Sequence, residues 1–263
     1  MLRAEHNLRR WLRPLATISI LLVAWLIISA TETVNPLFLP RVDAFGAALL
    51  KSLSDAETYK AIFATTYRAA IGLALSICFG VPFGLVFGRY PRLYEYVEIP
   101  ADFFRSIPSS ALFFLFILLF GIGDTSKVAV VFYGCSLIML VNAVYGARAT
   151  REKRDRINML RSFGANPLQV FTQAVFRDAL PSVCAGIRVC ISLSLVLVIV
   201  TEMFLGATVG LGRLIYDHYL TYRIPEMYAA VTVLGLIGFA ANKCFQLIEQ
   251  RVCFWLPSEE ELL

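Results

Sequence analysis

The chain carries little charge for its length. Of its 263 residues only 16% are Asp, Glu, Lys or Arg, and 58% are hydrophobic. Soluble domains have about a quarter charged and about half apolar residues, so this composition excludes an ordinary soluble fold. The mean hydropathy of +0.69 agrees. The composition therefore predicts an integral membrane protein.

Several motifs of nucleotide, metal and hydrolytic chemistry are also missing. No GxxxxGK[ST] phosphate loop is present and Gly-Lys never occurs, so the sequence does not predict ATP binding by this chain in the usual way. The absence of HExxH and GxSxG argues against an intramembrane enzyme. Two histidines and six cysteines without CxxC spacing predict neither a zinc site nor a disulfide framework. We expect no catalytic residue, no metal and no cofactor bound by this chain.

Six apolar stretches approach the roughly 20 residues that a membrane-spanning helix needs. They predict an all-α integral membrane protein with six spans. The fifth stretch is less uniform because it contains Arg188 and Glu202. The expected spans are 14–30, 69–88, 106–123, 128–147, 182–206 and 227–245, within a transmembrane domain of residues 14–250.

The distribution of Lys and Arg indicates the orientation. With six spans, the segments on the side of the termini hold 15 of these residues and those on the other side hold 7. Because basic loops face the cytoplasm, the tails 1–13 and 251–263 and the 34-residue segment 148–181 are expected there. No small-x-small cleavage site ends the first stretch, so we interpret it as a retained anchor. The net charge of +5 needs no nucleic acid to explain it.

Small residues recur at every fourth position of the second stretch. They leave one helix face free of large side chains, so another backbone can approach closely. We interpret this face as packing within the chain, with a dimer seam or a pathway lining as the alternatives. The residues are Gly72, Ser76, Gly80, Gly84 and Gly88.

The polar segment 148–181 lies between the fourth and fifth expected spans. It is long enough to form short helices outside the bilayer that contact a soluble partner. Gly164 can end such a helix in a left-handed conformation, and Pro167 then stops its continuation. Ile157 and Leu160, among many charges, give the helix an apolar edge. A helix lying on the lipid surface is the alternative.

Together, several short motifs resemble those of a known family. The chain is similar to the membrane-spanning permease subunit of bacterial ABC importers, binding-protein-dependent transporters of the nitrate, sulfonate and taurine type. The resemblance extends over about residues 35–255. The motifs are Phe38-Leu39-Pro40, Arg68, Arg105-Ser106-Ile107-Pro108, Phe120-Gly121-Ile122-Gly123, Gly164-Ala165, Ala179-Leu180-Pro181, Thr201-Glu202-Met203 and Gly210-Leu211-Gly212.

This resemblance implies both a fold and a set of partners. The implied fold is a six-helix polytopic bundle of the type I ABC importer permease kind, with cytoplasmic coupling helices between spans four and five. The implied partners are an ATPase subunit dimer holding ATP and Mg, a second permease copy or homologue, and an external substrate-binding protein. The location would be the bacterial cytoplasmic (inner) membrane. The implied substrate is a small polar anion such as nitrate, bicarbonate, taurine or another sulfonate, with an aromatic acid or vitamin precursor as the alternative.

In the family a Glu-Ala-Ala triplet begins the coupling segment six residues before its glycine. Other residues stand at these positions here, and Arg177 replaces a frequent proline. The resemblance implies that the segment still docks on the ATPase. The residues expected to couple are Asn158, Met159, Leu160, Arg161, Ser162, Phe163, Gly164, Ala165 and Pro181.

Polar groups inside the spans are candidates for the pathway or a gate. Arg188 and Glu202 are 14 residues apart, about 21 Å along a helix, so they share a face but cannot pair. Hydroxyl and amide groups offer the weak, reversible contacts that a conduit needs, although Ser and Thr often bond their own helix instead. The candidates are Asn142, Arg188, Ser192, Ser194, Thr201 and Glu202.

A secondary transporter driven by an ion gradient is the alternative function. Such proteins work without ATP and usually carry carboxylates at mid-membrane. Only Glu202 is a candidate for that role. The favoured hypothesis is therefore the permease subunit of an ATP-driven importer.

Overall fold

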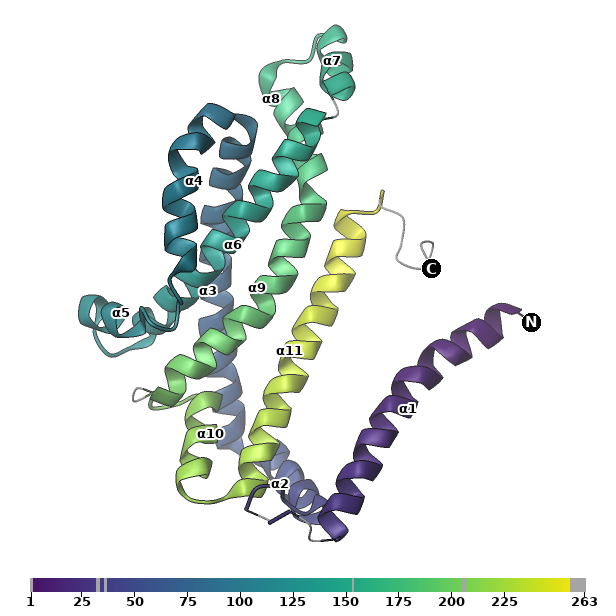
Figure 1. The fold of residues 1–263 in the computed structure, drawn as a ribbon, viewed down its shortest axis with the longest axis vertical. Helices are drawn as coiled ribbons and strands as arrows, with labels where there is room; N and C mark the ends of the chain where they lie inside the picture. The colour runs from purple at the N-terminus through teal and green to yellow at the C-terminus, as the bar shows by residue number, and fades with distance from the viewer. Residues whose placement is uncertain (1, 32–33, 36, 153, 205–206, 256–263) are drawn as a thin grey trace. The chain divides into compact units, whose positions relative to one another are not determined.

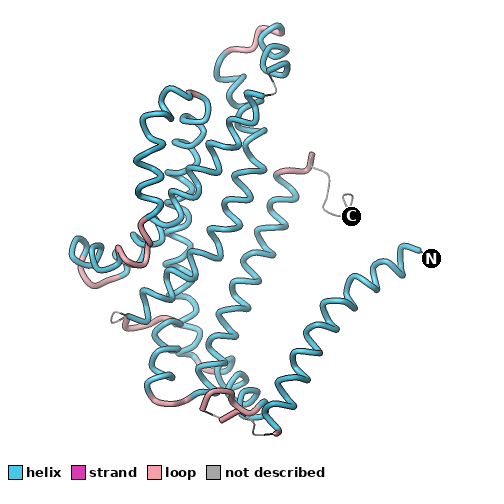
Figure 2. Tube along the Cα trace, viewed as in Figure 1, coloured by secondary structure: helices cyan, strands magenta, loops and turns pink. Residues whose placement is uncertain are grey.

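The structure is a computed structural model, and it describes all residues except 1, 32–33, 36, 153, 205–206 and 256–263. The described residues form helices and loops, with no strand among them (Figures 1 and 2), which confirms the predicted all-α class. In chain order the helices are α1 (Leu2–Ala30), α2 (Val42–Ser54), α3 (Ala56–Arg89), α4 (Pro91–Ser106), α5 (Phe113–Phe120), α6 (Asp124–Glu152), α7 (Arg154–Ser162), α8 (Pro167–Val170), the π-helix η1 (Phe171–Phe176), α9 (Arg177–Phe204), α10 (Leu211–Leu220) and α11 (Ile224–Val252).

Four helical segments in the described part of the chain are long and apolar enough to cross a membrane. A shorter apolar segment occupies part of α1. The chain is therefore a multi-pass membrane protein. The four segments are Ala56–Arg89, Asp124–Ala149, Pro167–Phe204 and Ile224–Val252, and the shorter one is Ala16–Ala30.

The chain divides into two units. The smaller comprises Met1–Tyr59 and Leu214–Val233, and the larger comprises Lys60–Arg213 and Leu234–Leu263. The larger unit contains α6, α9 and the polar segment between them, so it holds most of the residues expected to be functional.

In the smaller unit, α1 meets the loop that precedes α2. Trp25 donates its indole N–H to the Pro40 carbonyl at 3.2 Å, and its ring centroid lies 5.0 Å from that of Phe45. Most described side chains of α1 are exposed, including Ile20 and Leu21, as a lipid-facing helix requires. α1 begins at Leu2 and runs without a break into the first expected span, so residues 2–13 belong to the same helix.

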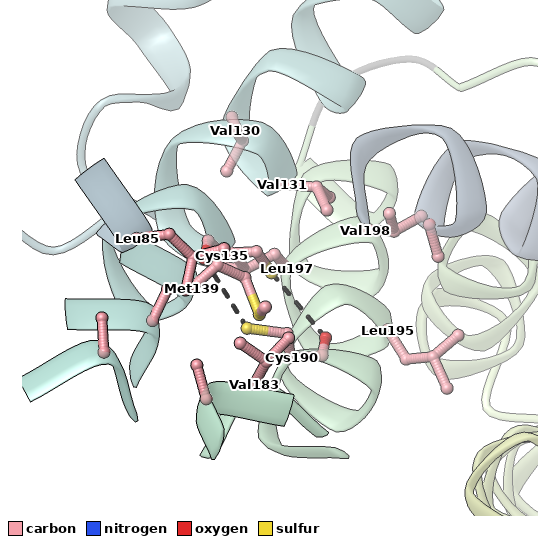
Figure 3. Packing of buried hydrophobic residues seen from close by; sticks show 14 of the residues in the cluster. Leu85, Val130, Val131, Cys135, Met139, Val183, Cys190, Leu195, Leu197 and Val198 are labelled. Carbon is pink, nitrogen blue, oxygen red and sulfur yellow. Dashed lines mark hydrogen bonds between the residues drawn. The ribbon is translucent and has the colours of Figure 1, made fainter. Parts of the chain in front are cut away.

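The larger unit is built around α6 and α9, which pack along most of their length (Figure 1). Their buried side chains form one hydrophobic core. Within it, Cys135 and Cys190 each direct the thiol at the other's backbone carbonyl, at 3.7 and 3.6 Å (Figure 3). All six cysteines are free thiols.

The small-residue face of α3 packs against α6. A Cβ placed on Gly72 would lie 2.5 Å from Val131 Cβ, and one on Gly80 would lie 2.6 Å from Met139 Cβ. Gly84 and Gly88 meet the next turns of α6 in the same way, and Ser76 donates to the Gly72 and Phe132 carbonyls. In the structure this face serves packing within the chain.

The expected span 106–123 is not one helix. α4 ends at Ser106, and α5 has eight residues, about 12 Å by helix rise, which is too short to span a membrane. The break has a local cause, because Ile107 precedes Pro108 and is extended, as residues before proline prefer. Gly121 then ends α5 with a φ of 79°.

Candidate functional site

The expected coupling segment folds as a helical hairpin, which we call the α7–α8 hairpin (Arg154–Val170). α6 extends to Glu152, and a continuous helical segment runs from Pro167 to Phe204, so the part that projects from the bundle is shorter than the expected segment 148–181 (Figure 1). Pro181 lies inside α9 and not in the hairpin.

A Schellman motif ends α7. Gly164 has a φ of 81°, its N–H donates to the Arg161 carbonyl at 2.9 Å, and the Ala165 N–H donates to the Leu160 carbonyl at 3.0 Å. This is the left-handed glycine ending that the sequence predicts, and it satisfies carbonyls that a helix end leaves free.

The next helix starts almost at once. Asn166 caps α8 by accepting from the Gln169 backbone N–H at 2.8 Å, while the Gln169 side chain accepts from the Asn166 N–H at 2.8 Å. Pro167 occupies the first turn of α8, where a missing N–H costs nothing. The proline thus begins a second helix as well as preventing continuation of the first.

A small core holds the hairpin together. Ile157 of α7 is buried with Val170 of α8 and Ala174 of η1, and Leu160 and Ala165 pack against them. The apolar edge expected on α7 therefore faces the rest of the hairpin. This core gives the projecting element a fixed shape of its own.

An ion pair joins the hairpin to the start of α9. Arg156 Nη1 lies 2.5 Å from Asp178 Oδ1, and Arg156 Nη2 donates to the Gln173 carbonyl at 3.3 Å. The Asp178 side chain is 9% exposed, and its other oxygen is buried and meets no hydrogen-bond partner among the side chains and backbone that the structure describes. The pair ties the orientation of α7 to α9.

The outer surface of the hairpin combines polar groups with large apolar side chains. Met159, Phe163 and Leu168 are 58%, 79% and 69% exposed. Asn158, Arg161, Ser162 and Gly164 are exposed as well, whereas Leu160 and Ala165 are partly buried. Large apolar side chains exposed on a polar projection are typical of a protein-binding surface.

The far end of α9 is held by a buried ionic cluster. Glu202 accepts from Arg68 Nη1 at 2.5 Å, from the Thr65 hydroxyl at 2.9 Å and from the Gly212 N–H at 3.0 Å. Arg68 also lies 2.8 Å from Asp124 through Nε. The cluster joins α3, α6 and α9 to the start of α10.

The sequence did not reveal these partners of Glu202. Arg68 and Asp124 are separated by 56 residues, and Arg68 and Glu202 by 134. The available signal was an arginine directly before an apolar stretch, which implies a nearby acid without identifying it.

The remaining pathway candidates differ in exposure. Ser194 and Thr201 are buried, and each hydroxyl donates to a carbonyl three residues earlier in α9. Asn142 is partly buried and donates to the Ile138 carbonyl of its own helix. Ser192 is exposed and Arg188 is partly exposed. Of these candidates, the last two are the ones that present polar groups at the surface of α9.

Comparisons with known proteins identify relatives of similar length. Residues 80–252 match the family described as binding-protein-dependent transport system inner membrane component. The chain is 24% identical over 264 residues to the taurine transport system permease protein TauC of Escherichia coli, covering 95% of each chain. It is 26% identical to the nitrate import permease protein NrtB of Synechocystis, covering 95% of this chain and 91% of the relative.

Further relatives support the same assignment. A putative aliphatic sulfonates transport permease protein of Bacillus subtilis is 23% identical, covering 95% of this chain and 90% of the relative. A chain from a solved structure of the MetNI methionine ABC transporter has a TM-score of 0.64 at 19% identity, covering 74% of this chain and 95% of that one. At that identity the match shows the fold, which is that of an ABC importer permease. The protein belongs to the binding-protein-dependent transport system inner membrane component family, as its motifs predict.

Proposed function

We propose that this chain is the permease subunit of an ATP-driven importer and forms half of a pathway for a small polar anion. Taurine, sulfonates and nitrate are the substrates for which its relatives are named, and bicarbonate belongs to the same chemical class. A substrate-binding protein would deliver the anion. An aromatic acid or vitamin precursor is the alternative cargo.

The partners follow from what the chain offers. The α7–α8 hairpin would dock on an ATPase dimer that binds ATP and Mg, since this sequence has no phosphate loop. The permease itself would be non-catalytic, and a second copy or a homologue would complete the pathway. The hairpin and both chain ends would lie in the cytoplasm, on the side that carries more Lys and Arg.

The exposed apolar group of the hairpin is the observation that carries this proposal. Ile157 and Val170 form the core inside the hairpin. Met159, Phe163 and Leu168 lie outside this core and are exposed. Helices that project from a membrane protein with such a surface suit a groove on a soluble partner.

The hairpin is also suited to transmit force. It is fastened to α9 by its small core and by the pair of Arg156 with Asp178, and α9 ends in the Glu202 cluster. Asp178 and Glu202 are 24 residues apart, about 36 Å along one helix. Closure of the ATPases would displace the hairpin and, through α9, shift the contacts of Glu202 at the other end.

Co-purification with the ATPase tests the docking role. Replacing Met159, Phe163 and Leu168 together by Ser is expected to abolish recovery of the ATPase, and scrambling residues 158–167 should do the same. The matched control replaces Asn166 and Gln169 by Ala, which removes the cap of α8 and leaves the apolar group in place. Full recovery of the ATPase with the triple variant, or import by the permease without any ATPase, would refute the proposal.

A further inference from the structure

Three pairs of side chains join α9 to α11 and to Cys253, which directly follows α11, and we call them the α9–α11 seam. On α9 they recur at every fourth residue, so they share one helix face. Their partners descend in number along α11, as antiparallel helices require (Figure 1). The pairs are Cys184 with Cys253, Sγ to Sγ 4.0 Å, Arg188 with Glu249, and Ser192 with Asn242, Oγ to Nδ2 3.1 Å.

On α9 the ionic part of this seam lies six residues inside the expected span 182–206, and on α11 it lies in the last turn, at Glu249. Arg188 is 10 residues, about 15 Å, from Asp178 and 14 residues, about 21 Å, from Glu202. Its side chain is nevertheless 40% exposed, and that of Glu249 is 21% exposed. A guanidinium that faces lipid is costly, by about 2.5–3.5 kcal/mol at the centre of a membrane helix, so such a side chain normally faces water or protein. The open side of the seam therefore suits water or protein.

A second cation lies on α11, next in sequence to the seam residue Asn242. Lys243 of α11 is exposed, and its ammonium donates to Gln246 Oε1 at 3.0 Å and lies 5.9 Å from the centre of the Phe239 ring. It follows Asn242 directly in the chain. With Arg188 and Glu249, it gives this region two positive charges against one negative charge. The expected span 227–245 contains this lysine.

Donors also outnumber acceptors here. A guanidinium carries five N–H donors and an ammonium carries three. Within the described residues Arg188 meets one carboxylate oxygen and Lys243 one amide oxygen. The Ser192 hydroxyl accepts from Asn242, so its own proton is available to donate. A ligand with several oxygens and a negative charge matches this set of groups.

We propose that Arg188, Ser192 and Lys243 form a transient oxyanion-binding station on the pathway, at which the sulfonate, nitrate or carboxylate group of the cargo replaces Glu249 as the partner of Arg188. The inference rests on the proposed import of a small anion. Glu249 acts as an internal competitor, because its carboxylate pairs with Arg188 again when the cargo leaves. A site with such a built-in competitor binds weakly and releases readily, which conduction requires.

A purely structural role of the Arg188–Glu249 pair makes different predictions. If Arg188 and Glu249 only fasten α11 to α9, replacing both by apolar residues of similar size should be close to neutral. If Arg188 also binds the cargo, the same double replacement must impair import. Arg188→Met/Glu249→Met therefore separates the two roles, and the pair is not left with one uncompensated charge.

The experiment uses the permease with its ATPase and binding protein in proteoliposomes. Uptake is measured for taurine, methanesulfonate, nitrate and bicarbonate, and the anion imported fastest by the wild type is the probe. We expect Arg188→Met/Glu249→Met to reduce its uptake at least tenfold, while assembly and basal ATP hydrolysis stay within twofold of the wild type. Lys243→Gln should raise the KM for uptake several-fold, and Glu249→Gln should lower both KM and maximal rate.

The control is Arg105→Met/Asp102→Met, which removes an exposed ion pair of the same chemistry from α4. It should leave uptake unchanged. Wild-type uptake by the double Met variant at Arg188 and Glu249 would overturn the oxyanion station and leave the importer role standing. Failure of the wild type to import any of the four anions would instead refute the proposed cargo, and the station with it.

Discussion

Arg68 binds two acidic side chains at once, with Nη1 2.5 Å from Glu202 Oε1 and Nε 2.8 Å from Asp124 Oδ1. A single guanidinium thus ties α3 to both α6 and α9. The Arg68 side chain is 6% exposed and that of Glu202 is fully buried, so this pair is closed to water, whereas the Asp124 side chain is 58% exposed. Ionic contacts as well as apolar packing therefore hold α3, α6 and α9 together at this cluster.

Replacing Arg68 by Met is expected to destabilise the protein strongly. The Glu202 carboxylate would stay buried without its counter-charge, and breaking a buried pair from one side costs about 3–5 kcal/mol. The melting temperature of the purified protein should fall sharply. Arg68→Met/Glu202→Gln should recover much of the loss, since the amide oxygen still accepts from Thr65 and Gly212. Arg41→Met, at an exposed pair with Asp43, is the control and should change little. Equal melting of the single and double variants would contradict this account.

The contact of α3 with α6 predicts a clear difference between two membrane glycines. In Gly80→Ala the new Cβ would lie 2.6 Å from Met139 Cβ and 2.8 Å from the Ser136 carbonyl oxygen, so the helices must separate. Such overpacking costs about 1–3 kcal/mol. Gly235→Ala in α11 meets nothing within 4 Å and serves as the control. Thermal melting should show a loss for the first variant only, and a similar response from both would count against the observed packing.

The pair of Arg156 with Asp178 should hold α7 in place without supporting the bundle. Arg156→Met leaves the largely buried Asp178 without its partner, at a cost of about 1 kcal/mol once the exposure of the arginine is considered. Hydrogen exchange at the amides of α7 should rise roughly fivefold, while the melting temperature of the bundle stays constant. Arg105→Met, at an exposed pair on α4, should not alter exchange in α7. Unchanged exchange in the Arg156 variant would show that the small core alone orders the hairpin.

Acidification is expected to weaken α10. Burial lowers the pKa of His218. The nearby cations Arg223 and Lys51 lower this pKa further, whereas Glu226 and Asp217 raise it without cancelling the effect of burial. The folded chain therefore binds this proton less readily than the unfolded chain, whose histidine pKa is near 6.5. The stability that the neutral His218 contributes is therefore complete above about pH 6.5 and is lost as the pH falls below that value. Melting temperatures between pH 8 and pH 5 should fall less for His218→Gln than for the wild type, and parallel curves would rule out this histidine as the source.

Local chemistry explains why much of the fold could be predicted. Apolar stretches mark α3, α6, α9 and α11, and the ending of α7 at Gly164 follows from the conformational freedom of glycine. The small-residue face of α3 is visible as a repeat of four. Each of these signals lies within one helix and needs no knowledge of the partner.

What could not be predicted depends on contacts between distant residues. The buried positions of Ser194 and Thr201 and the exposed position of Ser192 depend on which side of α9 meets α6 and α3, which the polarity of these residues does not reveal. The partners of Glu202 come from three other segments. Pro108 is a local signal for the break, but the residues around it are apolar, and for that reason a single span was expected there.

The π-helical turn Phe171–Phe176 allows the junction of the hairpin and α9 to tolerate the loss of one residue. Such a turn holds one residue more than an α-helix needs, so its loss can be absorbed while the flanking helices keep their mutual orientation. A residue removed at Gln173 would convert the wide turn into an ordinary one. The same deletion at Ser192 would rotate all later residues of α9 by about 100° and turn Glu202 away from Arg68. Loss of one residue at this junction would therefore leave the hairpin at the same angle to α9.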